Sequence, residues 1–309
     1  MIFDHEARKG RIGASEIAAL LGLNEYMTPL DVWMVKTGRK PHFEGNEHTR
    51  RGQRQERQIL EWMAEDIGCR IATDCPTLIH ESGIAAATPD GFVVVPKTDQ
   101  KWAIAHWAGT TVKSDAQALW EGMDILGDLI DLELAEAKST LSRVKCIEDI
   151  NVSHLIQCQW QMMVTGLKKC HLGIFGPMVS DYQRFEIEYD EALAMELLAQ
   201  AREWWERHII QDVQPEPINT SDALALWPVD DGSTIEAVPS LYEAINQYKD
   251  VNEQIKVLTK RKDDLKDRIT PAIGSAQIVT FGGSKVASWK HQSKKEYTVK
   301  ASETRVLRV

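Results

Sequence analysis

Two short segments with the character of β-strands carry three polar residues that would meet if the strands paired. The first is Thr88-Pro89-Asp90-Gly91, which leads into an apolar run, and the second is Glu136-Ala137-Lys138. Side chains two positions apart on a strand project from the same face of a sheet. We therefore expect Glu136 and Lys138 to point into one cleft, with Asp90 beside them if the strands pair.

Two carboxylates and a lysine in this arrangement can bind a divalent cation and act on a phosphodiester. Carboxylate oxygens suit Mg²⁺ and Mn²⁺, which makes Asp90 and Glu136 candidate metal ligands. The ammonium group of Lys138 could steady an attacking hydroxide or the charge that develops on a phosphate. The same residues also fit a plain Pro-Asp-Gly turn beside a solvated strand edge, so other parts of the sequence must decide between the two.

The bulk composition indicates a globular protein in a reducing compartment. The chain has 309 residues, of which 43% are hydrophobic and 27% are charged, and no apolar run is long enough to cross a bilayer. The N-terminus lacks the basic flank and apolar core of a secretory signal. The five cysteines form no Cys-x-x-Cys pair, so we expect buried free thiols and a cytoplasmic protein.

The net charge of −10 does not exclude a nucleic-acid partner. Binding to phosphates depends on the local field and not on the mean charge. Arginines gather between residues 50 and 57, and lysines gather in the last 34 residues. A metal-dependent nuclease also needs acidic residues at its centre, so the net charge leaves this class of function open.

Hydrophobic periodicity and capping residues predict three helices followed by a mixed sheet. The first three helices are expected at residues 13–22, with Ser15 as N-cap, at 28–38, and at 48–67. Strands are expected at residues 70–79, 85–95, 130–138, 169–175 and 182–189. Further helices are expected at residues 153–164 and 191–211. The sum is an α/β fold in which helices flank a mixed central sheet.

The domain organisation separates a core from a C-terminal arm. We expect the core at residues 1–212, a linker at 213–236, and the arm at 237–309. Residues 97–128 separate the two halves of the polar motif and are interpreted as an insertion with some helix. In the arm, apolar residues at three-four spacing predict a long helical or coiled-coil segment that Pro271 ends. Strands around Gly282-Gly283 then predict a small basic β-hairpin.

Two helices carry further polar candidates. Glu56 lies three residues before Ile59, on the buried side of the third helix, so its carboxylate could reach the metal cleft. A salt bridge with Arg57 on the helix surface is the alternative. Gln157 and Gln161 are four residues apart and share one face of their helix. They could line a phosphate backbone, a metal-bound water, or each other.

Basic residues near the N-terminus form a candidate anion site. The N-terminus of a helix offers free N–H groups to a phosphate, and an arginine adds a bidentate contact. Arg8, with Ser15 at the start of the first helix, has this character, and Arg11 lies between them. A basic N-terminal turn without a ligand is the alternative.

Five blocks of sequence occur in an order that resembles the YqaJ-type viral recombinases, the family that includes bacteriophage lambda exonuclease. The blocks are Arg8–Glu16, Arg51–Glu56, Thr88–Gly91, Glu136–Lys138 and Gln157–Thr165. The resemblance covers roughly residues 4–190. It implies a PD-(D/E)XK core, of the restriction-endonuclease type, that digests one strand of linear double-stranded DNA in the 5′→3′ direction. The 3′ single-stranded overhangs would serve phage recombination by strand annealing.

By matching position, the resemblance also implies roles for individual residues. Asp90 and Glu136 would bind Mg²⁺, or Mn²⁺ in its place, and Lys138 would assist the nucleophile. Glu56 would be an outer metal ligand, and Gln157 would complete the catalytic set. The residues expected at the DNA or at its 5′ phosphate are Arg8, Ser15, Arg11, Arg143 and Gln161.

The partners implied by the resemblance are DNA ends, a single-strand annealing protein and further copies of the chain. The location implied is the cytoplasm of a bacterial host of a phage or prophage. The insertion and the arm depart from the compact members of the family, so their ring-shaped assembly is not carried over. Two alternatives stay open: another PD-(D/E)XK nuclease, such as an endonuclease or a RecB-like enzyme, and a non-catalytic DNA-end-binding module.

Overall fold

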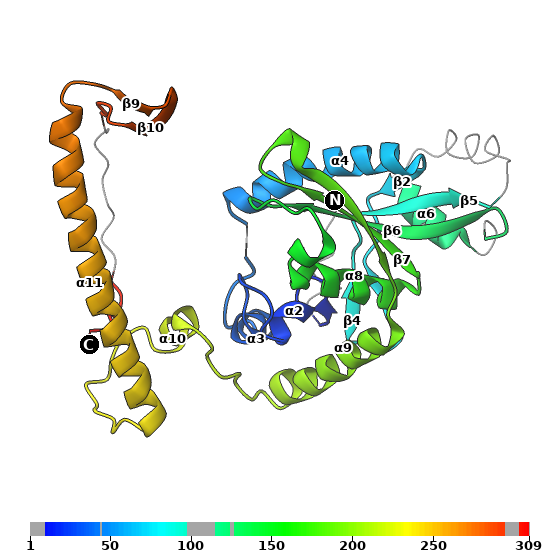
Figure 1. Cartoon of the computed structure of the whole chain (residues 1–309). Coiled ribbons are helices and arrows are strands. Elements are labelled where there is room, and N and C mark those ends of the chain that lie inside the picture. The colour runs from blue at the N-terminus through cyan, green and yellow to red at the C-terminus, as the bar shows by residue number, and fades with distance from the viewer. Residues whose placement is uncertain (1–9, 44, 98–114, 124–126, 294–302, 309) are drawn as a thin grey trace. The chain divides into compact units, whose positions relative to one another are not determined.

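The computed structural model describes residues 10–43, 45–97, 115–123, 127–293 and 303–308, and the chain forms two compact units. The first unit ends at Ile218 and contains a mixed sheet with helices on both faces (Figure 1). The second unit starts at Asn219 and contains a long helix and a hairpin. The segment expected to be a linker includes the helix α10 (Thr220–Leu226). The domain limits at residues 212 and 236 stay predictions.

A five-stranded sheet forms the centre of the first unit. Its strand order is β2-β5-β6-β7-β8, in which β6 and β7 run parallel and the other neighbours run antiparallel. The strands are β2 (Arg70–Thr73), β5 (Gly91–Pro96), β6 (Ile130–Ser139), β7 (Lys169–Phe175) and β8 (Tyr182–Glu188). A smaller sheet has the order β1-β4-β3 and consists of β1 (Ile12–Gly13), β4 (Ala85–Ala87) and β3 (Leu78–Ile79). The prediction of an α/β fold with a mixed central sheet is confirmed.

Capping residues determine where the main helices begin and end. Thr28 and Asp31 form a capping box at the start of α3 (Pro29–Lys36). Gly68, with a left-handed φ of 68°, ends α4 (Glu47–Ile67). The side chains of Asn151 and Asp190 cap α8 (Val152–Thr165) and α9 (Glu191–Trp204). The shorter segments are α2 (Ile17–Leu20), α6 (Asp115–Glu121), the 3-10 turns Ile147–Asp149 and Val179–Asp181, and a π-helical turn at Trp205–Ile210.

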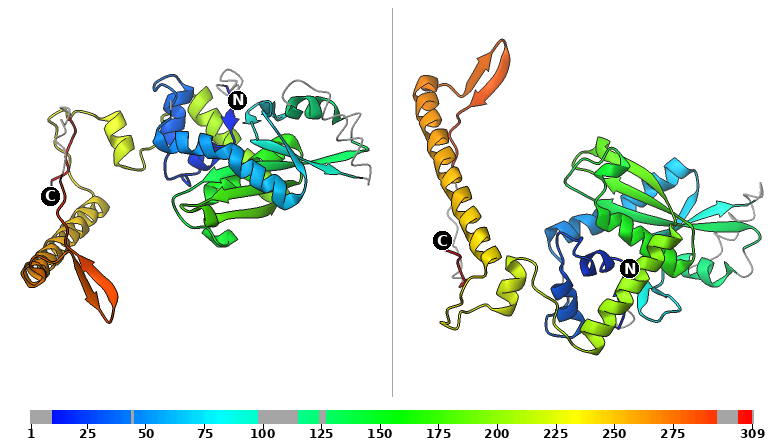
Figure 2. Two further views of the ribbon diagram at one scale, coloured as in Figure 1. Left: turned by 90° about the horizontal axis from the view of Figure 1, so that it is seen from above. Right: turned by 60° about the horizontal axis from the view of Figure 1, so that its bottom comes forward.

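Helices α4 and α8 cover opposite faces of the central sheet (Figure 1, Figure 2). On β6, Leu134 belongs to a core cluster that includes Cys158 and Met162 of α8. Its neighbour Ala135 belongs to a second cluster that includes Met63 of α4. Because side chains alternate along a strand, even-numbered residues of β6 face α8. This alternation decides which helix can contact Glu136 and Lys138.

Two predicted strands are interrupted in the structure. The segment expected at residues 70–79 forms β2 and β3, which belong to different sheets. Asp74 adopts a left-handed φ of 60° just after β2, and this turn redirects the chain. The segment expected at residues 85–95 forms β4 and β5, with residues 88–90 between them. Asp90 therefore lies immediately before the first residue of β5.

The first predicted helix is shorter than expected, and its predicted cap is wrong. Helix α2 has four residues, and its N-cap position is occupied by Glu16 and not by Ser15. The Glu16 carboxylate accepts a hydrogen bond from the backbone N–H of Gly13 at 2.7 Å and pairs with Lys36 at 2.8 Å. These bonds hold the turn that contains Ser15, so the helix begins only after it.

Part of the predicted insertion packs into the core of the first unit. Within α6, Ala116 and Leu119 are buried, and the indole of Trp120 stacks on Phe92 of β5 with the ring centroids 5.4 Å apart. The described part of the insertion is thus partly helical, as expected. Its segments at residues 98–114 and 124–126 lie outside the described residues.

The second unit consists mainly of helix α11 (Pro239–Ile273) and the hairpin of β9 (Ile278–Phe281) and β10 (Ser284–Ser288). The expected long helix and hairpin are confirmed. The helix continues through Pro271, which was expected to end it, and stops before Gly274. Gly282 and Gly283 have φ values of 58° and 81°, as a two-residue type I′ turn requires. Among the described residues, no helix is both long and apolar enough to cross a membrane.

The close approach of β7 to α4 gives a test of the packing. A Cβ atom added to Gly173 would lie 2.6 Å from Cε of Met63 and 2.8 Å from Cγ2 of Ile59. We expect Gly173→Val to lower the free energy of unfolding by roughly 1–3 kcal/mol, because the larger side chain displaces α4. Urea unfolding followed by circular dichroism measures this change.

The control is Gly52→Ala on α4, where an added Cβ meets no atom within 4 Å. Because alanine favours a helix more than glycine does, this variant should gain about 0.5–1 kcal/mol. If Gly173→Val is as stable as the unsubstituted protein, the packing described between β7 and α4 is wrong.

Candidate active site

Asp90, Glu136 and Lys138 come together where β5 begins beside the second half of β6. The strands pair with Gly91 opposite Ala135, which puts Asp90 next to Glu136. Oδ2 of Asp90 accepts a hydrogen bond from the backbone N–H of Ala137 at 2.8 Å. The two strands thus pair as the sequence led us to expect, and the two halves of the motif form one cluster.

The carboxylate of Glu136 is buried and is held by three side chains. Lys138 Nζ donates to Oε1 at 2.5 Å, and Gln157 Nε2 donates to the same oxygen at 2.6 Å. Gln161 Nε2 donates to Oε2 at 2.8 Å. Both glutamines project from adjacent turns of α8, which faces this side of β6. Since the Glu136 side chain is only 2% exposed, protein donors and not solvent set its orientation.

The charge of Glu136 raises the pKa values of two neighbouring carboxyl groups, those of Asp90 and Glu56. Burial and the charge of Glu136 raise the pKa of Asp90 well above its ordinary value, although Lys138 acts in the opposite sense. Burial and Glu136 also raise the pKa of Glu56, so Glu56 on α4 lies within electrostatic reach of the cluster. Burial lowers the pKa of Lys138, but Glu136 and Asp90 outweigh it and leave that pKa above its ordinary value. Lys138 is therefore protonated at neutral pH.

The cluster fits a hard divalent cation. Asp90 and Glu136 supply carboxylate oxygens, which Mg²⁺ and Mn²⁺ prefer, and a cation would relieve the repulsion that raises the pKa of Asp90. The buried Oε1 of Gln161 has no hydrogen-bond donor among the described residues. The described residues contain no group of three or more His, Cys, Asp or Glu side chains placed to hold a metal. Asp90 and Glu136 alone would therefore leave positions around such a cation for ligands from outside the chain.

The structure shows where most of the residues expected to bind DNA lie, and their binding to DNA stays a prediction. Arg8 lies outside the described residues. Ser15 is exposed in the turn before α2 and Arg11 is partly buried before β1, and α2 is too short to act as an anion-binding helix. The side chain of Arg143 is 53% exposed, and its Nε lies 3.2 Å from Oδ1 of Asp181.

Gln161 belongs to the carboxylate cluster and not to a DNA-facing surface. The residue is 1% exposed and its amide donates to Glu136, so DNA cannot reach it. We reassign Gln161 from a DNA contact to a residue that holds Glu136. The sequence signal for this role was its spacing of four residues from Gln157.

His154 is a neighbour of the cluster that sequence reasoning missed. It lies one turn before Gln157 on α8, and burial together with the charge of Lys138 lowers its pKa to about 3. The imidazole is therefore neutral at physiological pH. The available signal was again helical spacing, because residues three apart share a face of a helix.

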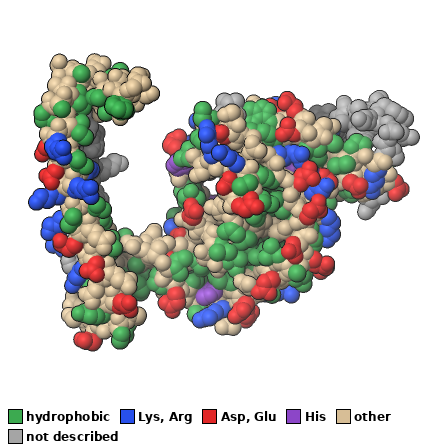
Figure 3. Space-filling model, in the orientation of Figure 1, with side chains coloured by type: hydrophobic (Ala, Val, Ile, Leu, Met, Phe, Trp, Pro, Cys, Tyr) green, Lys and Arg blue, Asp and Glu red, His purple; other side chains and the backbone are tan. Residues whose placement is uncertain are grey.

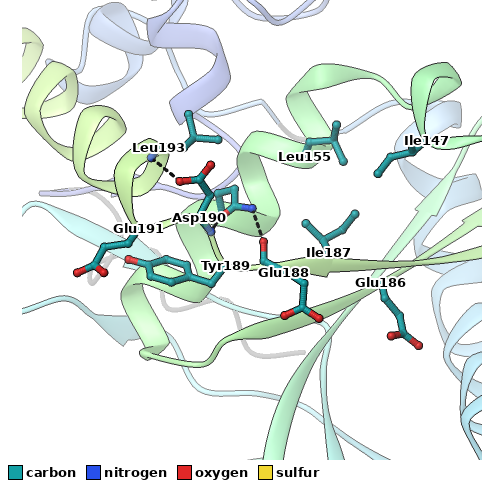
Figure 4. Close-up of a pocket in the computed structure, with 10 residues that line it drawn as sticks. Ile147, Leu155, Glu186, Ile187, Glu188, Tyr189, Asp190, Glu191 and Leu193 are labelled. Carbon is teal, nitrogen blue, oxygen red and sulfur yellow. Dashed lines mark hydrogen bonds between the residues drawn. The ribbon is translucent and has the colours of Figure 1, made fainter.

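A separate surface pocket lies against another face of α8 (Figure 4). Its lining includes Leu155 of α8 and Ile187 of β8. Gln159 also lines this pocket, donating from Nε2 to the carbonyl of Glu188 at 2.8 Å and accepting from the backbone N–H of Asp190 at 2.9 Å. These bonds tie α8 to the end of β8. Gln159 thus has a structural contact and takes no part in the carboxylate cluster.

The chain is similar to known proteins in sequence. Residues 5–168 match the family described as the YqaJ-like viral recombinase domain. The uncharacterized protein YqaJ of Bacillus subtilis (strain 168) is 24% identical over 294 residues. That alignment covers 92% of this chain and 81% of the Bacillus protein.

Solved structures of two exonucleases are also similar, at low TM-scores. An alkaline exonuclease (LHK-Exo) from Laribacter hongkongensis is 17% identical, with 67% of this chain and 91% of that chain covered and a TM-score of 0.43. A phage-related exonuclease from Haemophilus somnus 129PT is 11% identical, with 66% and 96% covered and a TM-score of 0.44. At these scores we draw no functional conclusion from the two structures.

The raised pKa of Asp90 predicts that its charge destabilises the chain when no metal is present. Because the pKa is higher in the folded than in the unfolded chain, the cost of ionisation is present at neutral pH and is lost as the pH falls. Asp90→Asn keeps an acceptor for the Ala137 N–H and removes the charge. In EDTA at pH 7 we expect this variant to gain on the order of 1 kcal/mol over the unsubstituted protein.

The pH dependence of the stability gained by Asp90→Asn distinguishes the loss of a buried charge from an improvement in packing. The advantage of Asp90→Asn, measured by urea unfolding in EDTA, should shrink as the pH is lowered toward about 4, the ordinary range for aspartate. Asp131→Asn is the control, because that side chain is 61% exposed and pairs with Lys97; its effect should stay within about 0.5 kcal/mol. A loss of stability in Asp90→Asn at pH 7 would contradict the described electrostatics.

Proposed function

The chain belongs to the YqaJ-like viral recombinase family, and on this premise we propose that it is a Mg²⁺-dependent 5′→3′ exonuclease of linear double-stranded DNA. Hydrolysis of one strand leaves 3′ single-stranded overhangs for strand-annealing recombination. The observation that carries the proposal is the cluster of Asp90, Glu136 and Lys138 at the junction of β5 and β6. We assign the core to the PD-(D/E)XK type on the same ground.

Each residue of the cluster has a distinct part in phosphodiester hydrolysis. Asp90 and Glu136 would hold the cation, with Glu56 as an outer acidic group. When bound, Mg²⁺ supplies Lewis-acid stabilisation of the charge that develops on the phosphate. The protonated Lys138 would donate a hydrogen bond to the attacking hydroxide or to a phosphate oxygen on which negative charge develops. Gln157 keeps the Glu136 carboxylate in the orientation that the cation requires.

The proposal extends to the DNA end and to the partners of the chain. Arg8, Ser15 and Arg11 would receive the terminal 5′ phosphate, and the exposed guanidinium of Arg143 would contact the DNA backbone. The family membership supports a single-strand annealing protein as a partner and assembly with further copies of this chain. The alternatives are an endonuclease of the same type and an end-binding protein without catalysis.

Linear duplex DNA labelled at either the 5′ or the 3′ end tests the activity and its direction. With Mg²⁺ we expect nucleotides from the 5′ end to be released first, and with EDTA we expect no hydrolysis. Denaturing gels over time measure both. Earlier release from the 3′ end would contradict the direction, and nicking of closed circles would support an endonuclease. Binding of ends without hydrolysis in Mg²⁺ or Mn²⁺ would support the end-binding alternative.

Substitution of Lys138 tests whether this residue acts in hydrolysis and not in DNA binding. Lys138→Ala should slow hydrolysis by roughly 10²–10³-fold, the usual loss for one donor at developing charge, while DNA binding in a gel-shift assay changes little. The control is Lys168→Ala, which removes the same charge from an exposed lysine whose ammonium lies over the Tyr189 ring at 4.0 Å; its rate should be unchanged. If Lys138→Ala keeps the full rate, Lys138 has no part in the mechanism.

A further inference from the structure

Helix α11 carries a strict seven-residue repeat. With Leu241 as position a, the residues at a and d form what we call the apolar seam. Its members are Leu241, Ala244, Tyr248, Val251, Ile255, Leu258, Lys262, Leu265, Ile269 and Ala272. All of these except Lys262 are apolar. A repeat of seven residues, sustained over the whole helix, is the pattern of a coiled coil and not of a helix that packs on a globular core.

The apolar seam is exposed to solvent. Each of its residues is exposed, and its large hydrophobic side chains are between 39% and 62% exposed. In Figure 3, hydrophobic side chains and Lys or Arg side chains are both visible on the surface of this helix. A water-exposed apolar stripe of this length marks an interaction surface.

The charges that border the apolar seam are basic. The e and g positions, which flank the seam in a coiled coil, include Arg261, Lys266 and Arg268, and Lys262 lies within the seam itself. The acidic residues of α11 all occupy the outer positions b, c and f: Glu243, Asp250, Glu253, Asp263, Asp264 and Asp267. The surface offered to a partner is therefore positive in its C-terminal half, although the helix contains nearly equal numbers of acids and bases.

A second copy of α11 does not match this surface. In a parallel pair, Lys262 would face Lys262 of the second copy, and Arg261 at g would face Lys266 at e. Both contacts are repulsive. In an antiparallel pair, Lys262 would face an apolar d position, and the second copy would still bring no acidic residue to the seam. Neither orientation neutralises the cations.

We propose that α11 docks an amphipathic helix of a different protein, whose own apolar seam is flanked by Asp and Glu. The apolar residues provide the affinity, and the cations at a, e and g select the acidic partner. The 35 residues of α11 give a contact length of about 50 Å. This proposal concerns the second unit and does not depend on nuclease activity in the first.

Two synthetic heptad peptides test the charge preference. Both carry Ile at a and Leu at d over five heptads; one has Glu at every e and g position, and the other has Lys there. Titration of the full chain with each labelled peptide, followed by fluorescence anisotropy, gives the two dissociation constants. We expect the glutamate peptide to bind about tenfold more tightly or better, because several ion pairs act together. Equal affinities, or no binding of either peptide, would overturn the proposal.

A charge-matched pair of variants tests where the glutamate peptide binds. The double substitution Lys262→Glu and Lys266→Glu reverses charges at a and e, whereas Lys256→Glu and Lys260→Glu reverses the same number at the outer b and f positions. Only the first variant should weaken binding, by about tenfold or more. Equal weakening in both variants would show general charge attraction and overturn the docking surface.

Self-association is tested separately on the full chain. The double variant Val251→Asp and Leu258→Asp places charges in the apolar seam, and sedimentation equilibrium compares its mass with that of the unsubstituted protein. We expect the same mass for both. A lower mass for the variant would show that a second copy covers the seam and would overturn the proposal.

Discussion

The candidate site depends on one buried carboxylate, that of Glu136. It lies on β6, which pairs with β5 on one side and β7 on the other, and it receives hydrogen bonds from Lys138, Gln157 and Gln161. A buried charge is tolerated only when donors satisfy it. The separation of α8 from the sheet is therefore set by these polar contacts as well as by the apolar core, and a shift of α8 would remove two of the three donors to this carboxylate.

Local signals in the sequence account for most of the fold. The helix ends at Thr28 and Gly68 were predictable because a capping box and a left-handed glycine act within one turn. The failures came where a longer-range or backbone effect decided the outcome. Asp74 takes a left-handed φ that few residues other than glycine adopt, and Glu16 displaces Ser15 as the cap through bonds to Gly13 and Lys36. Neither the backbone conformation of Asp74 nor the displacement of Ser15 can be recognised from the residue types in the sequence.

The candidate site was predictable in its centre and not at its margins. Strand alternation placed Glu136 and Lys138 on one face, and the register of β5 and β6 brought Asp90 to them. The spacing of Gln157 and Gln161 shows that they share one face of α8. It does not predict which part of the protein that face contacts, so the rotation of α8 about its axis could not be predicted. The tertiary structure turns this face toward Glu136, which converts Gln161 into a buried donor and brings His154 near Lys138.

The two units use lysine in opposite ways. Lys138 is surrounded by carboxylates of its own chain, which keep it protonated in spite of burial. Lys262 lies on an exposed apolar seam whose flanking positions hold cations and no acids. In the first case the carboxylates that pair with the lysine belong to the same unit. These carboxylates outnumber the lysine, so their net negative charge suits a divalent cation. In the second case the e and g positions that flank the seam contain no Asp or Glu. In our proposal, the carboxylates that pair with these cations belong to another protein. The net charge of −10 averages over both and describes neither.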